Sequence, residues 1–447
     1  MARFPITADS AVSYPGPPPA QTDVVVIGGG VIGVCTALYL TEAGQRVTLL
    51  EKGRIAGEQS SRNWGWIRQQ GRDPAELPIM MQARRDWCDL ARRTNTDFGL
   101  RQGGTVYLAR DDAKLAGYAR WQAIAQAHDL DTELLSAAQT AALFPGLTGT
   151  FKGALRTASD MHAEPALAVP ALAAIAARAG VTIVENCAVR ALDIAAGRVA
   201  GVVHEAGRIA ADSVVLAGGA WSSLFLANHG VHIPQLSVRD TVLATQPLPE
   251  VTLGTASNGR VAFRRRADGG YTLAPSGASE LFIGPDAFRA LPKFLPQLRD
   301  SPWAQTYLPM APKGYPDGWR TPRRWTPDQR TPFEDMRVLN PAPSQRRIKR
   351  ALRAFAALFP HLPQPQARQA WAGMIDTMPD IVPVVDRCAS LPGLIIGTGM
   401  SGHGFGIGPG MGRELAALVT GAHLGHDLTR FRASRFTDGS AIRLPPL

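Results

Sequence analysis

The sequence predicts an α/β fold built around a parallel sheet. Three apolar segments indicate this fold: Asp23–Ile27, Ser213–Gly219 and Leu394–Gly399 have the composition of buried parallel strands, and each runs into glycines. Ligands of an open α/β sheet bind outside the carboxyl ends of its strands. Three such ends, far apart in the chain, can therefore converge on one long ligand.

The first strand leads into a dinucleotide-binding pattern. A helix is expected over Val31–Ala43, and a G-x-G-x-x-G turn precedes and enters it, with Gly28, Gly30 and Gly33. The first glycine permits the tight turn, the second lets the backbone approach a pyrophosphate, and the third lets helix and strand pack. The next strand ends at Glu51, which is placed to hydrogen-bond a ribose hydroxyl. The helix N-terminus would supply amide donors to the phosphates.

The last junction favours FAD over NAD. It continues as a glycine-rich loop over residues 400–410, and a helix is expected over 411–420. A helix N-terminus can point at an anion, and reduced flavin carries negative charge along its N1 and O2 edge. A loop of purely structural turns is the alternative.

The composition is that of an ordinary globular protein. Of 447 residues, 45% are apolar and 19% charged, which excludes a disordered chain, a coiled coil and a collagen-like repeat. The four cysteines are far apart, so neither a disulfide framework nor a metal site is predicted, and a reducing cytoplasm is the expected location. Residues 1–21 lack the apolar segment of a signal peptide and are read as an N-terminal extension.

The net charge of +10 permits binding to nucleic acid or to anionic lipid. The basic residues are scattered, so no nucleic-acid partner is predicted and a solvated surface is the simpler interpretation. Peripheral contact with the inner face of a membrane is left open.

Four segments together resemble the family of glycine oxidases, sarcosine oxidases, D-amino acid oxidases and D-amino acid dehydrogenases. They are VVVIGGGVIG followed by Glu51, SSRNWGWIR (Ser60–Arg68), HAEP (His162–Pro165) with the strands after it, and SGHGF (Ser401–Phe405). The resemblance implies a Rossmann-type FAD-binding domain from residues 22–90, 155–232 and 370–447. It also implies a substrate domain with a mainly antiparallel sheet, from residues 91–154 and 233–369.

The resemblance also implies which residues contact FAD. The expected contacts are Gly28, Gly30, Val31, Ile32, Gly33, Glu51 and Lys52 in the first βαβ unit; Ser60, Ser61, Asn63, Trp64, Gly65 and Trp66 in a loop against the flavin; Val189, Gly218, Trp221, Gly373 and Met374; and Met400, Ser401, Gly402, His403, Gly404, Phe405 and Gly406. Val189 is expected at the end of a strand over Val181–Val189, after a helix over 166–179. Taken alone, Val189 and Trp221 are more often core residues than cofactor contacts.

Two departures from the family pattern bear on cofactor and substrate. Where sarcosine oxidases carry the cysteine that attaches flavin, this chain has Gly373, so noncovalent FAD is expected. The two positions that grip the substrate carboxylate in those enzymes hold Gly71 and Gly406. Arg68 matches a second family arginine.

The substrate-binding candidates are therefore Arg68, Arg72 and His403. Either Arg72 or an arginine from elsewhere, first Arg264–Arg266, compensates for the missing clamp, or the substrate lacks a carboxylate.

The function that follows is an FAD-dependent oxidoreductase that oxidises the C–N bond of an amino acid or a secondary amine to an imine, with hydride passing to flavin N5. No side chain is assigned as a catalytic base. His403 is read as shaping the loop or bonding the flavin edge. A lysine that promotes oxygen reduction in sarcosine oxidases aligns with Thr272, so a dehydrogenase is preferred to an oxidase that releases H2O2.

The electron acceptor is left open among a quinone, a partner protein and O2. The rival interpretations are an NAD-dependent dehydrogenase, a membrane-associated electron-transfer subunit and a nonenzymatic flavin-binding scaffold.

Residues 279–346 are read as an insert that covers the substrate site. Its aromatic residues Tyr307, Tyr315, Trp319 and Trp325 line an apolar pocket or, preferably, pack a small core of the insert itself.

Overall fold

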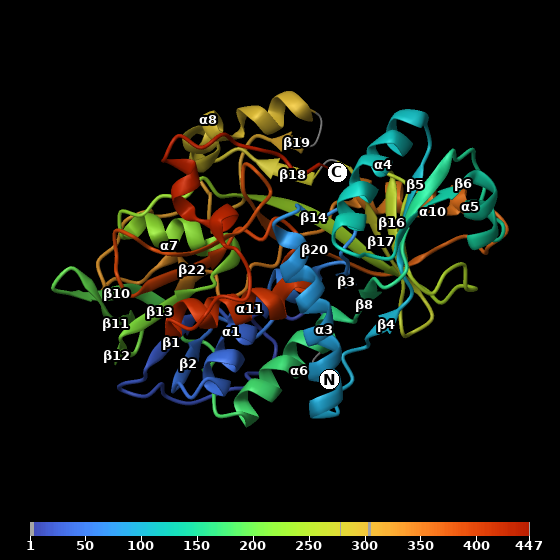
Figure 1. Cartoon of the computed structure of the whole chain (residues 1–447). Helices are drawn as coiled ribbons and strands as arrows, with labels where there is room; N and C mark the ends of the chain where they lie inside the picture. Colours follow the sequence, from blue (N-terminus) through green and yellow to red (C-terminus); the bar gives the residue numbers. More distant parts are fainter. Residues whose placement is uncertain (1–3, 278, 303–304, 447) are drawn as a thin grey trace.

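A computed structural model describes residues 4–277, 279–302 and 305–446. The first three residues of the expected N-terminal extension, and Trp303 and Ala304 of the insert, lie outside these ranges. Two large sheets organise the described chain, one of six strands and one of ten (Figure 1). The fold class is as predicted, with a Rossmann-type parallel sheet beside a mainly antiparallel one.

The six-stranded sheet has the order β21-β22-β13-β1-β2-β9, parallel except for the edge strand β21. Its strands are β1 (Val24–Ile27), β2 (Val47–Leu50), β9 (Thr182–Val184), β13 (Ser213–Leu216), β21 (Val384–Arg387) and β22 (Leu394–Thr398). The three predicted strand-to-glycine junctions are confirmed, because β1, β13 and β22 are neighbours in parallel register. Val25 and Val26 are fully buried, as expected for a strand covered on both faces.

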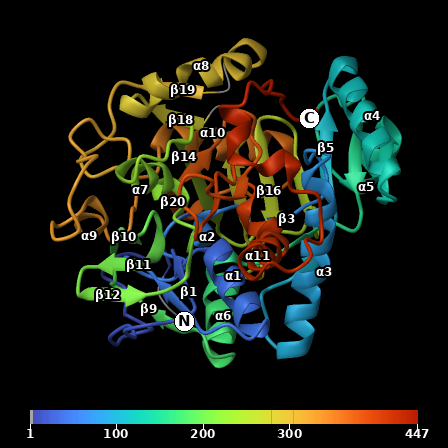
Figure 2. The same cartoon turned by 60° about the vertical axis from the view of Figure 1, so that its left-hand side comes forward.

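Four helices pack against one another beside this sheet (Figure 2). They are α1 (Val31–Glu42), α3 (Glu76–Thr94), α6 (Pro165–Arg178) and α11 (Gly404–Thr420). The prediction for α11 was wrong in its start, because the helix begins at Gly404 and not at 411. Gly404 and Phe405 of SGHGF therefore belong to the first turn of the helix, and His403 is its N-cap.

Three shorter pieces complete this part of the molecule. The first is a three-stranded sheet of β10 (Val189–Ala195), β11 (Arg198–His204) and β12 (Gly207–Ala210). The second is a three-stranded sheet of β3 (Trp66–Ile67), β4 (Arg101–Gln102) and β8 (Met161–His162). The third is a set of short helices: α2 (Gln59–Arg62), η1 (Gly219–Trp221), α7 (Ser222–Asn228), η2 (Thr429–Phe431) and η3 (Ala433–Phe436). The expected strand over Val181–Val189 is two strands: β9 ends at Val184, and Val189 begins β10. Asn186, between them, has a φ of 54°, which breaks the extended run.

The ten-stranded sheet has the order β19-β18-β14-β17-β16-β15-β5-β7-β6, and β20 pairs along β14. Its strands are β5 (Thr105–Ala109), β6 (Thr132–Ser136), β7 (Gly153–Thr157), β14 (Leu236–Thr245), β15 (Thr255–Ser257), β16 (Val261–Arg265), β17 (Tyr271–Pro275), β18 (Ser279–Phe282), β19 (Gln305–Leu308) and β20 (Ala367–Thr377), with helices α4 (Asp112–Ala127), α5 (Ala137–Leu143) and α10 (Gln345–Leu358) against it. The expected domain boundaries at 154/155 and 369/370 fall inside β7 and β20. β20 thus belongs to the large sheet and also extends to the six-stranded sheet's side of the molecule.

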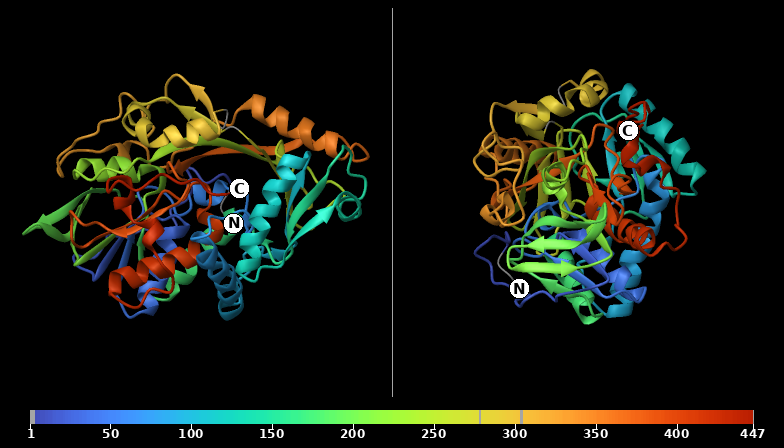
Figure 3. Two further views of the ribbon diagram at one scale, coloured as in Figure 1. Left: turned by 45° about the horizontal axis from the view of Figure 1, so that its top comes forward. Right: turned by 90° about the vertical axis from the view of Figure 1, so that its left-hand side faces the viewer.

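The insert contains β18, β19, α8 (Pro285–Asp300) and α9 (Pro332–Asp335) and lies at the end of the molecule away from α6 (Figure 3). Tyr315 and Trp325 are buried in aromatic contacts with Phe282 and Phe333, whereas Trp319 is 51% exposed. Half of the predicted aromatic set therefore packs inward.

The N-terminal segment is part of the packed structure. Gln21 forms a parallel bridge to Ala210 of β12, and the amides of Ser13 and Tyr14 donate to the carboxylate of Glu185. Phe4 packs edge-on against Trp371, with ring centroids 4.8 Å apart.

Candidate active site

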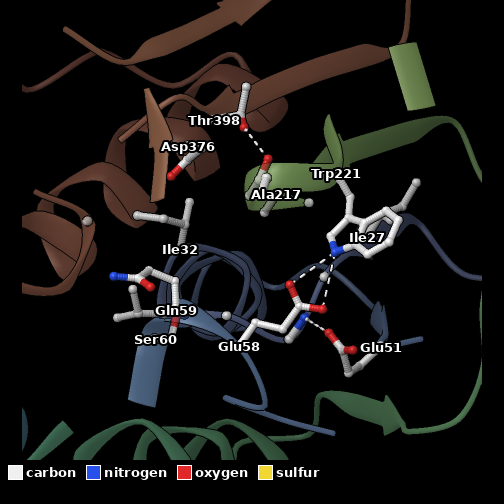
Figure 4. Close-up of a pocket in the computed structure, with 18 of the residues that line it drawn as sticks. Ile27, Ile32, Glu51, Glu58, Gln59, Ser60, Ala217, Trp221, Asp376 and Thr398 are labelled. Carbon is white, nitrogen blue, oxygen red and sulfur yellow. Dashed lines mark hydrogen bonds between the residues drawn. The ribbon is translucent and has the colours of Figure 1, made fainter. Parts of the chain in front are cut away.

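A long cavity lies at the carboxyl ends of β1, β2, β13 and β22 (Figure 4). Of the expected cofactor contacts, those that line it are Gly28, Gly30, Val31, Ile32, Glu51, Lys52, Ser60, Asn63, Val189, Gly218, Trp221, Met374, Met400, Gly402, Gly404 and Phe405. The convergence of distant segments that the sequence predicted is therefore present in the structure.

The glycine turn is closed by backbone contacts. A Cβ on Gly33 would overlap the carbonyl oxygen of Gly28, and Gly28 itself has a φ of 110°. A Cβ on Gly30 would meet only the Oγ of Ser60, at 3.0 Å. Gly33 is thus needed for packing, while Gly30 leaves open the face that turns toward the cavity.

Glu51 follows β2 and is held by main-chain donors. Its carboxylate accepts from the amides of Gly29 and Gly53, each at 2.7 Å. Burial raises the pKa of Glu51 to about 7, and the two amides and Lys52 oppose that rise. The acid can stabilise the glycine turn and also accept from a ribose hydroxyl.

Sequence reasoning missed Glu58, which forms a polar wall beside Glu51. Its carboxylate accepts from the Trp221 indole at 3.0 Å (Figure 4) and from the Lys52 ammonium at 2.6 Å. Lys52 lies 4.4 Å from the centre of the Trp221 ring. Phe333 of the insert packs on the same indole, so the insert covers this end of the cavity.

At the other end, Asp376 was also missed, although it stands in the WAGMID segment that contains Gly373. Its carboxylate accepts from the amides of Gly399 and Met400 at 2.7 and 3.1 Å, and burial raises its pKa. It joins β20 to the loop before α11. The sequence signal that could have found Asp376 is an acidic residue close to two expected FAD contacts, Gly373 and Met374.

Gly373 and Gln59 face each other across the cavity wall. A Cβ on Gly373 would overlap the Oε1 of Gln59, and this buried oxygen has no hydrogen-bond partner within the described residues. Gln59 also lines the cavity, and a buried polar atom without a partner calls for an explanation.

The remaining expected contacts lie behind the cavity wall. Gly33 and Gly373 pack as described above, and the others are Ser61, Trp64, Gly65, Trp66, Ser401, His403 and Gly406. The Trp64 carbonyl accepts from Arg264, Ser401 Oγ accepts from the Met378 amide, and the Gly406 carbonyl accepts from the Trp87 indole. These residues support the loops that face the cavity.

The predicted substrate residues meet in a buried charged cluster, defined as Arg68, Arg72, Glu76 and His403. Arg72 Nη1 lies 3.6 Å from Glu76 Oε2, and His403 Nδ1 lies 3.2 Å from the same oxygen. Arg68 is half-buried near Tyr107, while Arg72 is only 2% exposed. Arg72 Nη1 and Glu76 Oε1 have no hydrogen-bond partner in the described chain.

Charges in this cluster oppose one another. Burial lowers the pKa of His403 to about 4, reinforced by Arg72 and opposed by Glu76. Burial alone would raise the pKa of Glu76, but His403 and Arg72 hold it below its usual value. A neutral His403 that donates Nδ1–H to an ionised Glu76 satisfies both directions and leaves Nε2 as an acceptor.

Two of the three alternative arginines, Arg264 and Arg266, are held in ion pairs, and Arg265 donates to the Leu248 carbonyl. Arg264 makes a bidentate pair with Glu164, at 2.8 and 3.0 Å, and donates to the Trp64 carbonyl at 2.8 Å. Because of this pair the pKa of Glu164 falls to about 2 despite burial. Arg266 pairs with Asp268 at 3.2 Å. Neither replaces the missing clamp without breaking an ion pair.

The site fits a dinucleotide such as FAD. The glycine turn, the start of α1 and the carboxylate of Glu51 would take the pyrophosphate and a ribose, and the unpartnered Gln59 oxygen lies further along the wall. No group of His, Cys, Asp and Glu in the described ranges is arranged to hold a metal ion. None of the helices described is both long and apolar enough to cross a membrane.

Three known proteins show how far this chain resembles others. The chain is 29% identical to human sarcosine dehydrogenase over 277 residues, which is 58% of this chain and 30% of that protein. It is 27% identical to glycine oxidase of Pseudomonas aeruginosa over 89% of this chain and 94% of that one. Its structure superposes on L-amino acid deaminase from Proteus myxofaciens with a TM-score of 0.90 and 29% identity, over 96% of each chain.

The chain thus spans about a third of the length of the sarcosine dehydrogenase that it matches. Residues 23–418 match the family model described as DAO, FAD dependent oxidoreductase. The FAD predicted from the glycine junctions is the cofactor of that family, which accounts for the cavity and excludes the NAD-dependent alternative. The chain belongs to the DAO family of FAD-dependent oxidoreductases.

Proposed function

We propose that this protein is a dehydrogenase that oxidises the C–N bond of an amino acid to an imine, with FAD held noncovalently. The observation that carries the proposal is the charged cluster beside the start of α11. It brings two guanidinium groups within electrostatic reach of His403, which stands between the cavity residues Gly402 and Gly404, and one of them has a buried nitrogen without a hydrogen-bond acceptor in the described chain. A secondary amine with a carboxylate fits the same chemistry.

The similarities support an amino acid as substrate. The P. myxofaciens protein acts on L-amino acids by its name, and the P. aeruginosa protein on glycine, and both match most of this chain.

Within the cluster, Arg68 would bind the substrate carboxylate. It is half-buried, whereas Arg72 is enclosed and faces Glu76. Arg72 would raise the positive potential around that carboxylate, and burial together with Arg72 would keep His403 neutral. FAD supplies the hydride acceptor, so the protein mainly orients the substrate and excludes water.

A dehydrogenase is favoured over an oxidase by the charges around Thr272. This residue is buried in β17, at the position where the sequence comparison expected a lysine in oxidases. The only arginines that its hydroxyl contacts in the described chain, Arg264 and Arg266, are paired with carboxylates. Paired cations stabilise a superoxide anion less than a free lysine would.

We also propose that the insert touches a membrane surface. Six of the eight exposed large apolar side chains among the described residues belong to it: Phe288, Leu291, Leu295, Tyr307, Met310 and Trp319. The first three share one face of α8, and Lys293 lies on the same helix. Co-sedimentation with anionic vesicles that is lost in Phe288→Ser/Leu291→Ser supports this contact, and binding that is unchanged in that double variant contradicts it.

The main test is anaerobic mixing of the yellow holoenzyme with a panel of amino acids and amines. Bleaching near the flavin maximum by an amino acid supports the proposal, and failure of the whole panel overturns it. Arg68→Gln should raise KM by about tenfold or more, because a buried carboxylate would lose its partner. Exposed Arg120→Gln, on α4, is the matched control.

Acid precipitation should release all of the flavin, and flavin left in the pellet contradicts noncovalent binding.

A further inference from the structure

A second cavity of about 330 Å³ lies beside the cofactor cavity. Asn63 lines both, and the neighbouring Ser60 and Ser61 line the first and the second respectively. Its other walls come from the ten-stranded sheet, from the start of α6 and from Phe4 of the N-terminal segment. A volume of this size falls at the low end of small-molecule sites, roughly 300–1,000 Å³.

The sheet wall is a row of side chains on one face. Arg264 of β16 is opposite Thr272 of β17, Thr272 is opposite Ala244 of β14, and Ala244 is opposite Gln369 of β20. Side chains directly opposite across strands point to the same face. Ala244 stands between longer side chains, so its small size leaves room in the middle of the row.

The cavity runs from an exposed mouth to a buried floor. The mouth is spanned by the ion pair of Arg368 with Asp268, at 3.2 Å, and both residues are exposed. The floor is formed by the buried Ser61 and Trp371, next to Asn63 and the cofactor cavity. A molecule from solvent can therefore come close to the cofactor without passing the charged cluster.

The charges of this cavity argue against an anionic ligand. Its three arginines are all paired, Arg264 with Glu164 and both Arg266 and Arg368 with Asp268. An amino-acid carboxylate would have to break one of these pairs. A neutral ligand with hydrogen-bond acceptors and a flat ring meets the Thr272 hydroxyl and the rings of Trp371 and Phe4 instead.

We propose that the second cavity binds the headgroup of a quinone, which is the electron acceptor of the enzyme. This inference rests on the proposed function for its biological role. The reaction balances with the reduced cofactor as donor, because the quinone gains two electrons and two protons, becomes the quinol and leaves the cofactor oxidised. The proposal separates the two half-reactions in space, with amino acid at the charged cluster and quinone at the sheet face.

The test fills the cavity at Ala244. Holoenzyme and its Ala244→Phe variant are reduced by light and a chemical photoreductant, which needs no substrate, and mixed with a short-tail benzoquinone without oxygen. Reoxidation should slow about tenfold or more in Ala244→Phe and stay within about twofold in Ala244→Ser, which changes the volume little. Titration of the oxidised holoenzymes with the quinone, followed by calorimetry, should show the same order of weakened binding.

The outcomes decide between occupants. Unchanged quinone reoxidation and binding in a folded, FAD-replete Ala244→Phe protein overturns the proposal. Slower reoxidation by O2 with unchanged reoxidation by quinone also overturns it and assigns the cavity to oxygen. If Ala244→Phe does not fold, the same measurements on Thr272→Val decide, because loss of the hydroxyl should weaken quinone binding severalfold. Failure of every amine to bleach the flavin would sink the proposed function and leave these results standing.

Discussion

The cofactor cavity and the charged cluster meet at the start of α11, but the main chain shapes the first and side chains shape the second. The cavity is shaped by main-chain atoms, such as the carbonyl of Gly28 and the amides that hold Glu51 and Asp376. The cluster is shaped by long side chains that neutralise one another, Arg72 with Glu76 and Glu76 with His403. A wall of backbone tolerates few residue types, whereas a cluster of side chains can exchange its members.

The difference predicts how each region fails. Loss of a glycine should remove FAD whether or not the protein stays folded, because the backbone path is what binds. Loss of a charge in the cluster should act first on stability and on substrate binding, with FAD retained.

The largest effect is expected from Gly33→Val. Its Cβ would overlap the Gly28 carbonyl, so neither helix nor turn can form unchanged, and both folding and FAD binding should be lost. Gly30→Val should fold, because its Cβ meets only Ser60 Oγ at 3.0 Å, yet it should lose FAD. The ratio of flavin to protein absorbance and thermal unfolding measure both. Gly117→Ala, on α4, is the control, and a folded Gly30→Val protein with full FAD would disprove the assigned turn.

The same difference explains what the sequence could predict. The glycine turn, Glu51 and the three strand ends follow from local spacing, and the structure confirms that they converge. Arg72 and Glu76 are four residues apart, but the contact of Glu76 with His403 joins α3 to α11 across 327 residues, and no local pattern marks that contact. Arg264 looked available for substrate because its partner, Glu164, is 100 residues away in the chain. The late start assigned to α11 has a local cause, since glycines within SGHGFGIGPG were read as loop.

The second effect tests whether the cluster needs its internal balance. Arg72→Leu leaves the Glu76 carboxylate buried without this cation, which should cost about 3–5 kcal/mol in the free energy of unfolding. Denaturant unfolding of the holoenzyme measures that loss, and FAD should remain bound in the folded fraction. Arg72→Leu/Glu76→Leu should recover much of the stability, because no unpaired charge remains. A double variant as unstable as the single one contradicts the pairing.

A smaller effect is expected from Glu51→Ala in the cofactor cavity. The substitution removes a charge-assisted acceptor for a ribose hydroxyl, so FAD binding should weaken by about 1.5–3 kcal/mol. It also leaves the amides of Gly29 and Gly53 without their acceptor. Calorimetric titration of apoprotein with FAD measures the change. If FAD binding is lost altogether, Glu51 acts by holding the glycine turn as much as by bonding the ribose. The backbone of the cavity would then depend on this side chain for its shape.

The smallest effect is the pH dependence that His403 gives the cluster. Burial lowers the pKa of His403 to about 4, below its ordinary value of 6.5. Between pH 4 and pH 6.5 this histidine is therefore protonated in the unfolded chain and neutral in the folded chain. Stability should therefore be complete above pH 6.5 and fall as the pH drops through 4, by about 2 kcal/mol at pH 5, at 1.36 kcal/mol per pKa unit. His403→Asn lacks this titration, so unfolding of the wild type and the variant at pH 7 and pH 5 isolates it. Equal losses in the two proteins would mean that His403 is charged in the folded state, and Glu76 would then hold a cation and not a neutral donor.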